Sequence, residues 1–351
     1  DATPLFLLVL AEYGDRTGDL ALVQELWPAA VAAMRWIDAV ADEAGYVTYA
    51  RRTPRGLVNQ GWKDSHDAIS HADGTLAEPP IALAEVQAYV YAARRGLARL
   101  ARRLGHFADS ATWDAQAARL QEGFHRDFWL ADEGTFALAL DGHGRPCRVV
   151  SSNAGHCLFG GIAEGEKARQ VISRLMRDDM FCGWGVRTLS TRARRYNPMS
   201  YHNGSVWPHD NALIAAGFAR YGAGEQVQQL LTAIFNASLG IENRRLPELF
   251  CGFARHQHPS PVPYPVACKP QAWAAGSVFL LLQAVLGLRI DAWERRVTFE
   301  RATLPPWLNR LDIRGLYVRQ ARLDLSITRG HWHAAVEVLK REGEVEVVVR
   351  T

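Results

Sequence analysis

The chemically densest part of the chain runs from Asn59 to Asp67 and reads Asn-Gln-Gly-Trp-Lys-Asp-Ser-His-Asp. It contains two carboxylates, two amides, a lysine and a tryptophan. Tryptophan can stack on the apolar face of a sugar ring while carboxylate and amide groups bond the ring hydroxyls. The segment therefore fits a sugar subsite. An ordinary polar turn with one anchoring tryptophan remains the alternative.

Two further clusters combine aromatic and hydrogen-bonding residues. The first cluster consists of two neighbouring segments, Gly183–Thr188 and Tyr201–Asp210. The second is Leu246–Gly252, in which Glu248 stands among apolar neighbours. Each cluster alone is a weak signal. Because all three lie on long links between helical segments, and long links in a compact domain are often functional, we expect them to meet in one cleft.

Other chemistries fit the sequence poorly. His66 and His71 with the nearby aspartates could bind a metal, but no helical His-Glu-x-x-His pattern is present. Nucleophile-elbow, phosphate-loop and dinucleotide fingerprints are also missing. The five cysteines are an odd number without a Cys-x-x-Cys pair, so a disulfide framework is not expected. We expect instead a reducing, cytoplasmic location. We expect no metal and no cofactor.

Helical periodicity must position these loops. Apolar residues from Leu20 to Ala41 recur every three or four positions, as do those from Leu83 to Leu104. Similar segments near 113–124, 163–176, 206–221, 225–236 and 271–287 predict stacked helical hairpins. The links 42–80, 129–152, 177–205 and 237–270 are long. From residue 291 the pattern alternates with period two, so we expect a helical domain over 1–290 and antiparallel β structure over 291–351.

Composition limits the class of protein. The 351 residues are 48% hydrophobic and 22% charged, which excludes a disordered chain. A net charge of +3, from 40 basic and 37 acidic residues, gives no signature of nucleic-acid binding. The longest apolar run, Ala272 to Leu288, is interrupted by Ser277 and Gln283, so no membrane span is expected.

Five segments together resemble bacterial proteins of the amylo-α-1,6-glucosidase (glycogen debranching enzyme) type, in the group of six-hairpin glycosidases. These segments are NQGWKDSHDAI, EPPIALAEVQAYVYAA, YHNGSVWPHDNALIA, LPELFCGF and KPQAWAAGSVFLLL. The resemblance covers roughly residues 1–290 and implies an (α/α)6 toroid. The family's toroid has twelve helices and about nine are expected here, so the resemblance implies that the first helices and an N-terminal portion of the same protein are missing.

The resemblance also implies the site. The general acid corresponds to Asp64, with Asp67 as a rival, and the general base to Glu248, with Glu242 as a weaker rival. Further substrate-binding positions are Gln60, Trp62, Lys63, Asp67, Glu85, Gln87, Trp184, Arg187, Tyr201, His202, Asn203, Trp207 and Trp273.

The implied activity is inverting hydrolysis of α-glucosidic bonds, with the α-1,6 branch points of glycogen-like glucans as the expected substrate. The first alternative is an exo-acting hydrolase of the same toroid group that acts on small α-glucosides or glucosyl osmolytes. The second is a non-catalytic carbohydrate-binding or scaffold protein. A pure binding module needs the aromatic residues but not two opposed carboxylates, so the joint presence of Asp64 and Glu248 favours catalysis.

Overall fold

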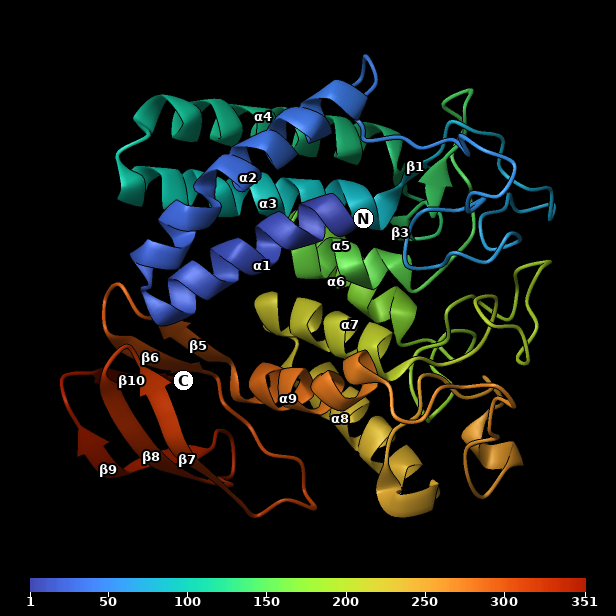
Figure 1. The fold of residues 1–351 in the computed structure, drawn as a ribbon. Helices are drawn as coiled ribbons and strands as arrows, with labels where there is room; N and C mark the ends of the chain where they lie inside the picture. Colours follow the sequence, from blue (N-terminus) through green and yellow to red (C-terminus); the bar gives the residue numbers. More distant parts are fainter.

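The computed structural model describes residues 1–351 and contains nine α-helices followed by a β region (Figure 1). The helices are α1 (Ala2–Thr17), α2 (Leu20–Val40), α3 (Ala84–Leu104), α4 (Phe107–Asp127), α5 (Asn153–Gly160), α6 (Gly165–Leu175), α7 (Pro208–Arg220), α8 (Gly224–Leu239) and α9 (Ala272–Leu286). Two short 3-10 turns, η1 (Glu242–Arg244) and η2 (Arg255–Gln257), lie between α8 and α9. The predicted helices are confirmed. None of the nine combines the length and the unbroken apolar run that a membrane-spanning helix needs.

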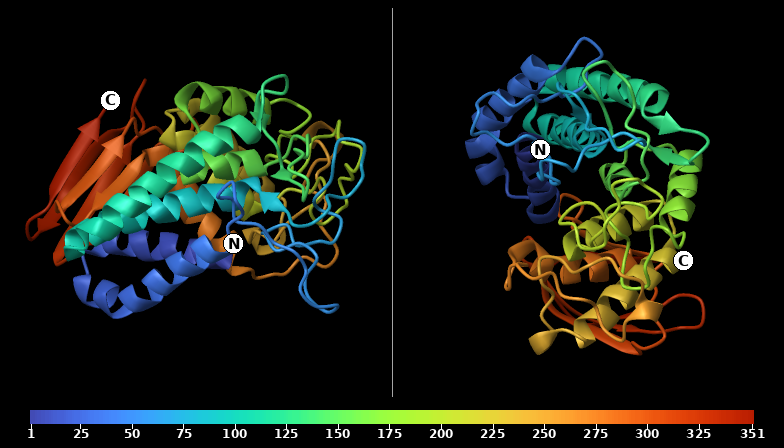
Figure 2. Two further views of the ribbon diagram at one scale, coloured as in Figure 1. Left: turned by 90° about the horizontal axis from the view of Figure 1, so that it is seen from above. Right: turned by 90° about the vertical axis from the view of Figure 1, so that its right-hand side faces the viewer.

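The helices form antiparallel pairs, and the odd-numbered helices pack in succession, α1 on α3, α3 on α5, α5 on α7 and α7 on α9. The right-hand view of Figure 2 shows that this arrangement curves around a centre. Helix α2 illustrates why the sequence folds this way. Asp19 caps its first turn by accepting hydrogen bonds from Ala21 and Leu22, and the predicted stripe from Val23 to Ile37 is buried against the neighbouring helices.

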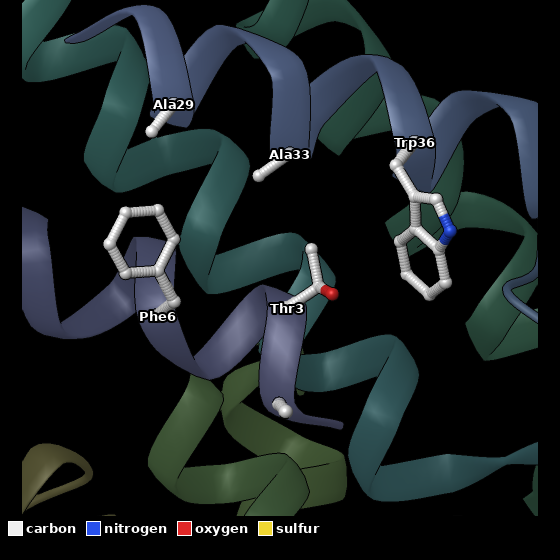
Figure 3. A pocket seen from close by; sticks show the side chains of 6 residues that line it. Thr3, Phe6, Ala29, Ala33 and Trp36 are labelled. Carbon is white, nitrogen blue, oxygen red and sulfur yellow. The ribbon is translucent and has the colours of Figure 1, made fainter. Parts of the chain in front are cut away.

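The row of odd-numbered helices exposes apolar surface at both of its ends. At the first end, α1 and α2 enclose an open groove of about 460 Å³, lined by Ala2, Thr3, Phe6, Ala29, Ala33 and Trp36 (Figure 3). At the other end, α9 exposes Ala272, Ala275, Gly276 and Phe279 on one face. This partial six-hairpin toroid agrees with the expected fold. The bare apolar side chains are Phe6 and Val9 on α1 and Trp36 on α2, whereas Met34 is buried.

The C-terminal β region lies at the end of the helices opposite the long links (Figure 1). Its strands are β5 (Leu288–Asp291), β6 (Arg296–Glu300), β7 (Arg310–Val318), β8 (Ala321–Thr328), β9 (Ala335–Glu342) and β10 (Glu346–Arg350). The order β7-β8-β9 is antiparallel, and the alternating side chains Leu323, Leu325 and Ile327 are buried. One pairing departs from the expected antiparallel pattern, because β10 runs parallel to β6.

The long links gather at the end where the odd-numbered helices α3, α7 and α9 begin (Figures 1 and 2). Short pairings tie these links together. Strand β1 (Ala82–Leu83) pairs with β4 (Ala139–Leu140), and β2 (Trp129–Leu130) pairs with β3 (Thr135–Phe136). Val206 bridges Phe250, which in turn bridges Pro263. The links are therefore held against one another, as a site built from several loops requires.

Candidate active site

An aromatic cluster lies where three of the long links meet. Trp62, Trp207 and Leu249 form a small apolar core of their own, separate from the main one, and Tyr201 and Tyr264 pack against it. The ring of Trp207 is stacked on His202 at 5.0 Å and perpendicular to Trp62 at 5.7 Å. These residues come from all three of the segments that the sequence singles out. The structure therefore brings the three clusters together.

Asp64 extends from this cluster toward solvent. Half of its side chain is exposed, and its Oδ1 lies 4.0 Å from Nδ1 of His202. Burial, together with the charges of Lys63 and His209, lowers the pKa of His202 to about 3. His202 is therefore neutral at neutral pH and makes no ion pair with Asp64. Its Nδ1 instead lies 2.7 Å from the hydroxyl of Ser65.

Asp67, the rival candidate for the acid, is anchored more firmly. The Asn203 side chain donates to the Asp67 carboxylate at 3.1 Å and to its backbone carbonyl at 3.2 Å. Asp67 therefore fastens the first loop to the Tyr201 segment. Asp64 has no such anchor and is the more available of the two carboxylates.

Glu248 is 6% exposed and lies among hydrogen-bond donors. Tyr201 donates its hydroxyl to Oε1 at 2.8 Å, and the Gln271 side chain donates to the same oxygen at 3.4 Å. The backbone N–H of Cys268 donates to Oε2 at 3.2 Å. The rival Glu242 is exposed on η1 and takes no part in this network. Glu248 is thus held in a defined orientation beside the aromatic cluster.

Tyr201 connects the two carboxylates. Burial, the hydrogen bond to Glu248 and the charges of Glu248 and Asp64 raise its pKa well above the usual value. The hydroxyl therefore stays protonated and remains a donor at neutral pH. The Tyr201 ring also lies 4.6 Å from the ring of His202, whose Nδ1 is 4.0 Å from Asp64. Glu248 and Asp64 therefore border the same aromatic cluster, although they are far apart in the sequence.

Charged and polar groups lie buried around the Trp62 ring. Lys63 donates to the carbonyl of Thr188 at 2.7 Å, and burial lowers its pKa to about 8. Both carboxylate oxygens of the fully buried Glu85 have no hydrogen-bond partner in the protein. His156, which is stacked on Trp62 at 5.5 Å, connects the hydroxyl of Tyr89 to the carboxylate of Asp210. This polar layer fixes the indole ring from the side of the helices.

Several residues expected to bind substrate have other contacts instead. The Gln87 amide is hydrogen-bonded to the backbone of Val47 and Leu83. Arg187 donates to the carbonyls of Gly252 and Asp178, and Trp184 is buried beside the guanidinium of Arg255. Gln60 is exposed at the rim of the first loop and reaches the carbonyl of Ala50. These contacts support the loops rather than line the aromatic cluster.

Trp273 stacks on His209 at 4.0 Å and is 40% exposed, so it extends the aromatic surface outward. His209, His156 and Gln271 also contact the site, and their types and spacing in the sequence do not mark them as site residues. Gln271 could have been noticed as the polar residue that opens the apolar segment of α9. No group of three or more His, Cys, Asp or Glu side chains is arranged to hold a metal ion. His71, considered as a metal ligand, instead faces the carboxylate of Asp141 at 3.3 Å.

Comparison with known proteins identifies relatives by sequence. A family model described as "Mannosylglycerate hydrolase MGH1-like glycoside hydrolase domain" matches residues 2–245. The mannosylglycerate hydrolase of Rubrobacter radiotolerans is 26% identical over 147 residues, which are 40% of this chain and 33% of that protein. Mannosylglycerate hydrolase MGH1 of Selaginella moellendorffii is 36% identical over 96 residues, 27% of this chain and 19% of that protein. The chain thus matches a third or less of the length of these curated relatives.

Solved structures share the fold at low sequence identity. The GH63 mannosylglycerate hydrolase from Thermus thermophilus in complex with glucose gives a TM-score of 0.59 at 18% identity, covering 79% of this chain and 74% of that one. A GH78 family rhamnosidase of Bacillus sp. GL1 gives a TM-score of 0.69 at 17% identity, covering 99% of this chain and 32% of that one. At such identities the likeness shows the architecture alone.

Proposed function

The chain belongs to the family of mannosylglycerate hydrolase MGH1-like glycoside hydrolase domains, and from this membership we propose that it hydrolyses α-glycosidic bonds with inversion of configuration. Asp64 is the general acid and Glu248 the general base. The observation that carries the proposal is the pair of carboxylates at one aromatic cluster: Asp64, half exposed beside His202, and Glu248, held by three donors.

The two carboxyl groups take different roles in the proposed mechanism. Asp64 acts in its acid form and donates a proton to the glycosidic oxygen as the bond to the anomeric carbon breaks. Glu248 takes a proton from a water molecule that attacks the anomeric carbon from the opposite face. Inverting glycosidases keep their two carboxyl groups about 6.5–9.5 Å apart to leave room for such a water, and the proposal requires the same of Asp64 and Glu248. Trp62 and Trp207 offer the aromatic surface on which a sugar ring stacks.

The substrate is a finer proposal. We propose an α-glucoside cleaved from its non-reducing end, because buried residues around Trp62 close the site on the side of the helices. The five sequence segments resemble debranching enzymes and favour α-1,6 branch points of a glucan. The relatives named above are mannosylglycerate hydrolases and favour a small glycoside instead. The five cysteines are all free, four of them buried, which fits a cytoplasmic enzyme, and we also propose this location.

The test is monosaccharide release from a panel of α-1,6- and α-1,4-linked gluco-oligosaccharides, mannosylglycerate, glucosylglycerate and an aryl α-glucoside. We expect Glu248→Gln to lower kcat by about 10²- to 10⁴-fold on the substrate that is cleaved. Glu242→Gln, on the exposed η1 turn, is the matched control and should keep the wild-type rate. Release from no substrate would favour a binding protein, and an active Glu248→Gln variant would remove Glu248 as the base.

A further inference from the structure

The two oxygens of the Glu248 carboxylate have different numbers of protein donors. Oε1 accepts from the Tyr201 hydroxyl at 2.8 Å and from Gln271 Nε2 at 3.4 Å, whereas Oε2 accepts only from the Cys268 N–H at 3.2 Å. A carboxylate oxygen has two lone pairs and can accept two hydrogen bonds. The protein therefore saturates Oε1, and Oε2 can accept one more.

The orientation of the Gln271 amide is fixed from both ends. Gln271 is the N-cap of α9, and its Oε1 accepts from the Ala272 N–H at 3.0 Å. A flipped amide would place an oxygen against the Glu248 carboxylate and an NH₂ group against the Ala272 N–H. Both contacts would be unfavourable, so Nε2 must face Glu248. The start of α9 thus determines which donor Oε1 receives.

A second link attaches Glu248 to the same segment. The Glu248 N–H donates to the carbonyl of Cys268 at 3.1 Å, while the Cys268 N–H donates back to the Glu248 side chain. Together with Gln271, this reciprocal pair connects the backbone and the carboxylate of Glu248 to the four residues that precede α9. Motion of the carboxylate relative to α9 would break its bonds with the Gln271 amide and the Cys268 N–H.

We propose that Oε2 of Glu248 is the atom that receives the proton of the attacking water, and that Gln271 is a positioning residue that directs Oε2 toward this water. The inference rests on the proposed function. In the step, the water oxygen bonds to the anomeric carbon and one water proton passes to Oε2. The glycosidic C–O bond breaks, and the leaving oxygen takes the proton of Asp64. Exchange with solvent then removes the proton from Glu248 and returns a proton to Asp64.

The test starts from Gln271→Met, which has similar length and no donor. We expect kcat to fall by about 10- to 100-fold with KM within about twofold, because a misdirected base matters in the transition state and not in substrate binding. The matched control is Gln283→Met on the same helix, whose amide donates to the carbonyl of Leu288 at 3.2 Å, far along α9 from Glu248. It should keep the wild-type kcat.

Leaving-group dependence separates a defect in water activation from one in acid catalysis. The loss in Gln271→Met should be equal on aryl glycosides with good and poor leaving groups. The loss in Asp64→Asn should shrink on good leaving groups, which need little protonation. If the Gln271→Met loss also shrinks on good leaving groups, Gln271 acts through the acid and the inference is wrong.

A second variant separates the catalytic effect from the lost helix cap. Gln271→Ser keeps a favourable N-cap residue but is too short to reach Glu248. We expect it to lose as much kcat as Gln271→Met while its melting temperature stays closer to wild type. Recovery of kcat in Gln271→Ser would show that only the cap matters and would overturn the inference.

The double variant Glu248→Gln/Gln271→Met links Gln271 to the base. It should be no slower than Glu248→Gln alone, because Gln271 then has no base to direct. A further multiplicative loss would mean that Gln271 acts elsewhere. If Gln271→Met keeps the wild-type kcat while Glu248→Gln is inactive, this inference is wrong and the proposed function stands. If Glu248→Gln is active, the proposed function is wrong as well.

Discussion

Replacing Gly252 by alanine should displace the two loops of the site without touching a catalytic group. Gly252 lies four residues after Glu248, and its N–H donates to the carbonyl of Pro198 at 2.8 Å while its own carbonyl accepts from Arg187 at 2.7 Å. A Cβ built on Gly252 would lie 1.7 Å from the carbonyl oxygen of Gly204, and real Cβ contacts stay beyond 3.0 Å. The clash is with backbone, so no side-chain rotation relieves it.

The two backbones must therefore separate by about 1.3 Å. Because a misplacement of about 1 Å can cost about 100-fold in rate, we expect kcat to fall by about 100-fold. Forced overpacking should lower the free energy of unfolding by about 1–3 kcal/mol. The assay is the initial rate on the substrate found with the panel, together with thermal unfolding of the same preparation.

Gly224→Ala is the matched control, because a Cβ on Gly224 at the start of α8 meets no atom within 4 Å. It should keep the wild-type kcat and melting temperature. If Gly252→Ala also keeps both, the joint between the Glu248 and Tyr201 segments does not position the site, and the reasoning fails.

Three further predictions concern the same structure. Tyr201→Phe keeps the aromatic contacts and loses the hydrogen bond to Glu248. A hydrogen bond to a charged group contributes about 1.5–3 kcal/mol, so kcat should fall by about 10- to 100-fold, and an unchanged kcat would contradict this role of Tyr201. Burial holds the pKa of His202 at about 3 and that of His209 at about 4, so as the pH falls below about 6.5 these histidines bind protons in the unfolded chain before they do in the folded one. The free energy of unfolding should therefore fall, by about 2 kcal/mol per histidine at pH 5. Denaturant unfolding should show this loss, and the loss should be smaller in His209→Phe. The apolar groove between α1 and α2 and the exposed face of α9 should make the chain associate in solution. Light scattering measures this, and a stable monomer would contradict the prediction.

The helices were predictable from sequence, whereas the exact contacts of the site were not. The stripe from Val23 to Ile37 has a strong helical period, and it is buried as expected. Strand direction in the C-terminal region was only partly predictable, because alternation records which face is buried and not which strand is the neighbour. The alternation therefore does not indicate that β10 pairs with β6 in parallel.

Side-chain roles depend on partners that are distant in the sequence. Gln87 follows Glu85 in a segment that resembles a substrate-binding one, but its amide is taken by Val47, 40 residues away. Gln271 lies in one of the segments that carry the resemblance, but its contact with Glu248 joins residues 23 positions apart and does not show in the sequence. Residue types and spacing indicated which loops carry the chemistry, and packing determined which side chains in them can reach the Glu248 carboxylate.

The stereochemistry of the product tests the central claim most directly. Proton NMR of the anomeric signals in the first minutes of hydrolysis, before mutarotation mixes the products, reports the configuration at which the sugar is released. If Glu248 activates water while Asp64 protonates the leaving oxygen, an α-linked substrate gives the β-sugar first and no covalent glycosyl-enzyme forms. Early accumulation of the α-sugar would contradict the inverting mechanism and the role of Glu248 as the base.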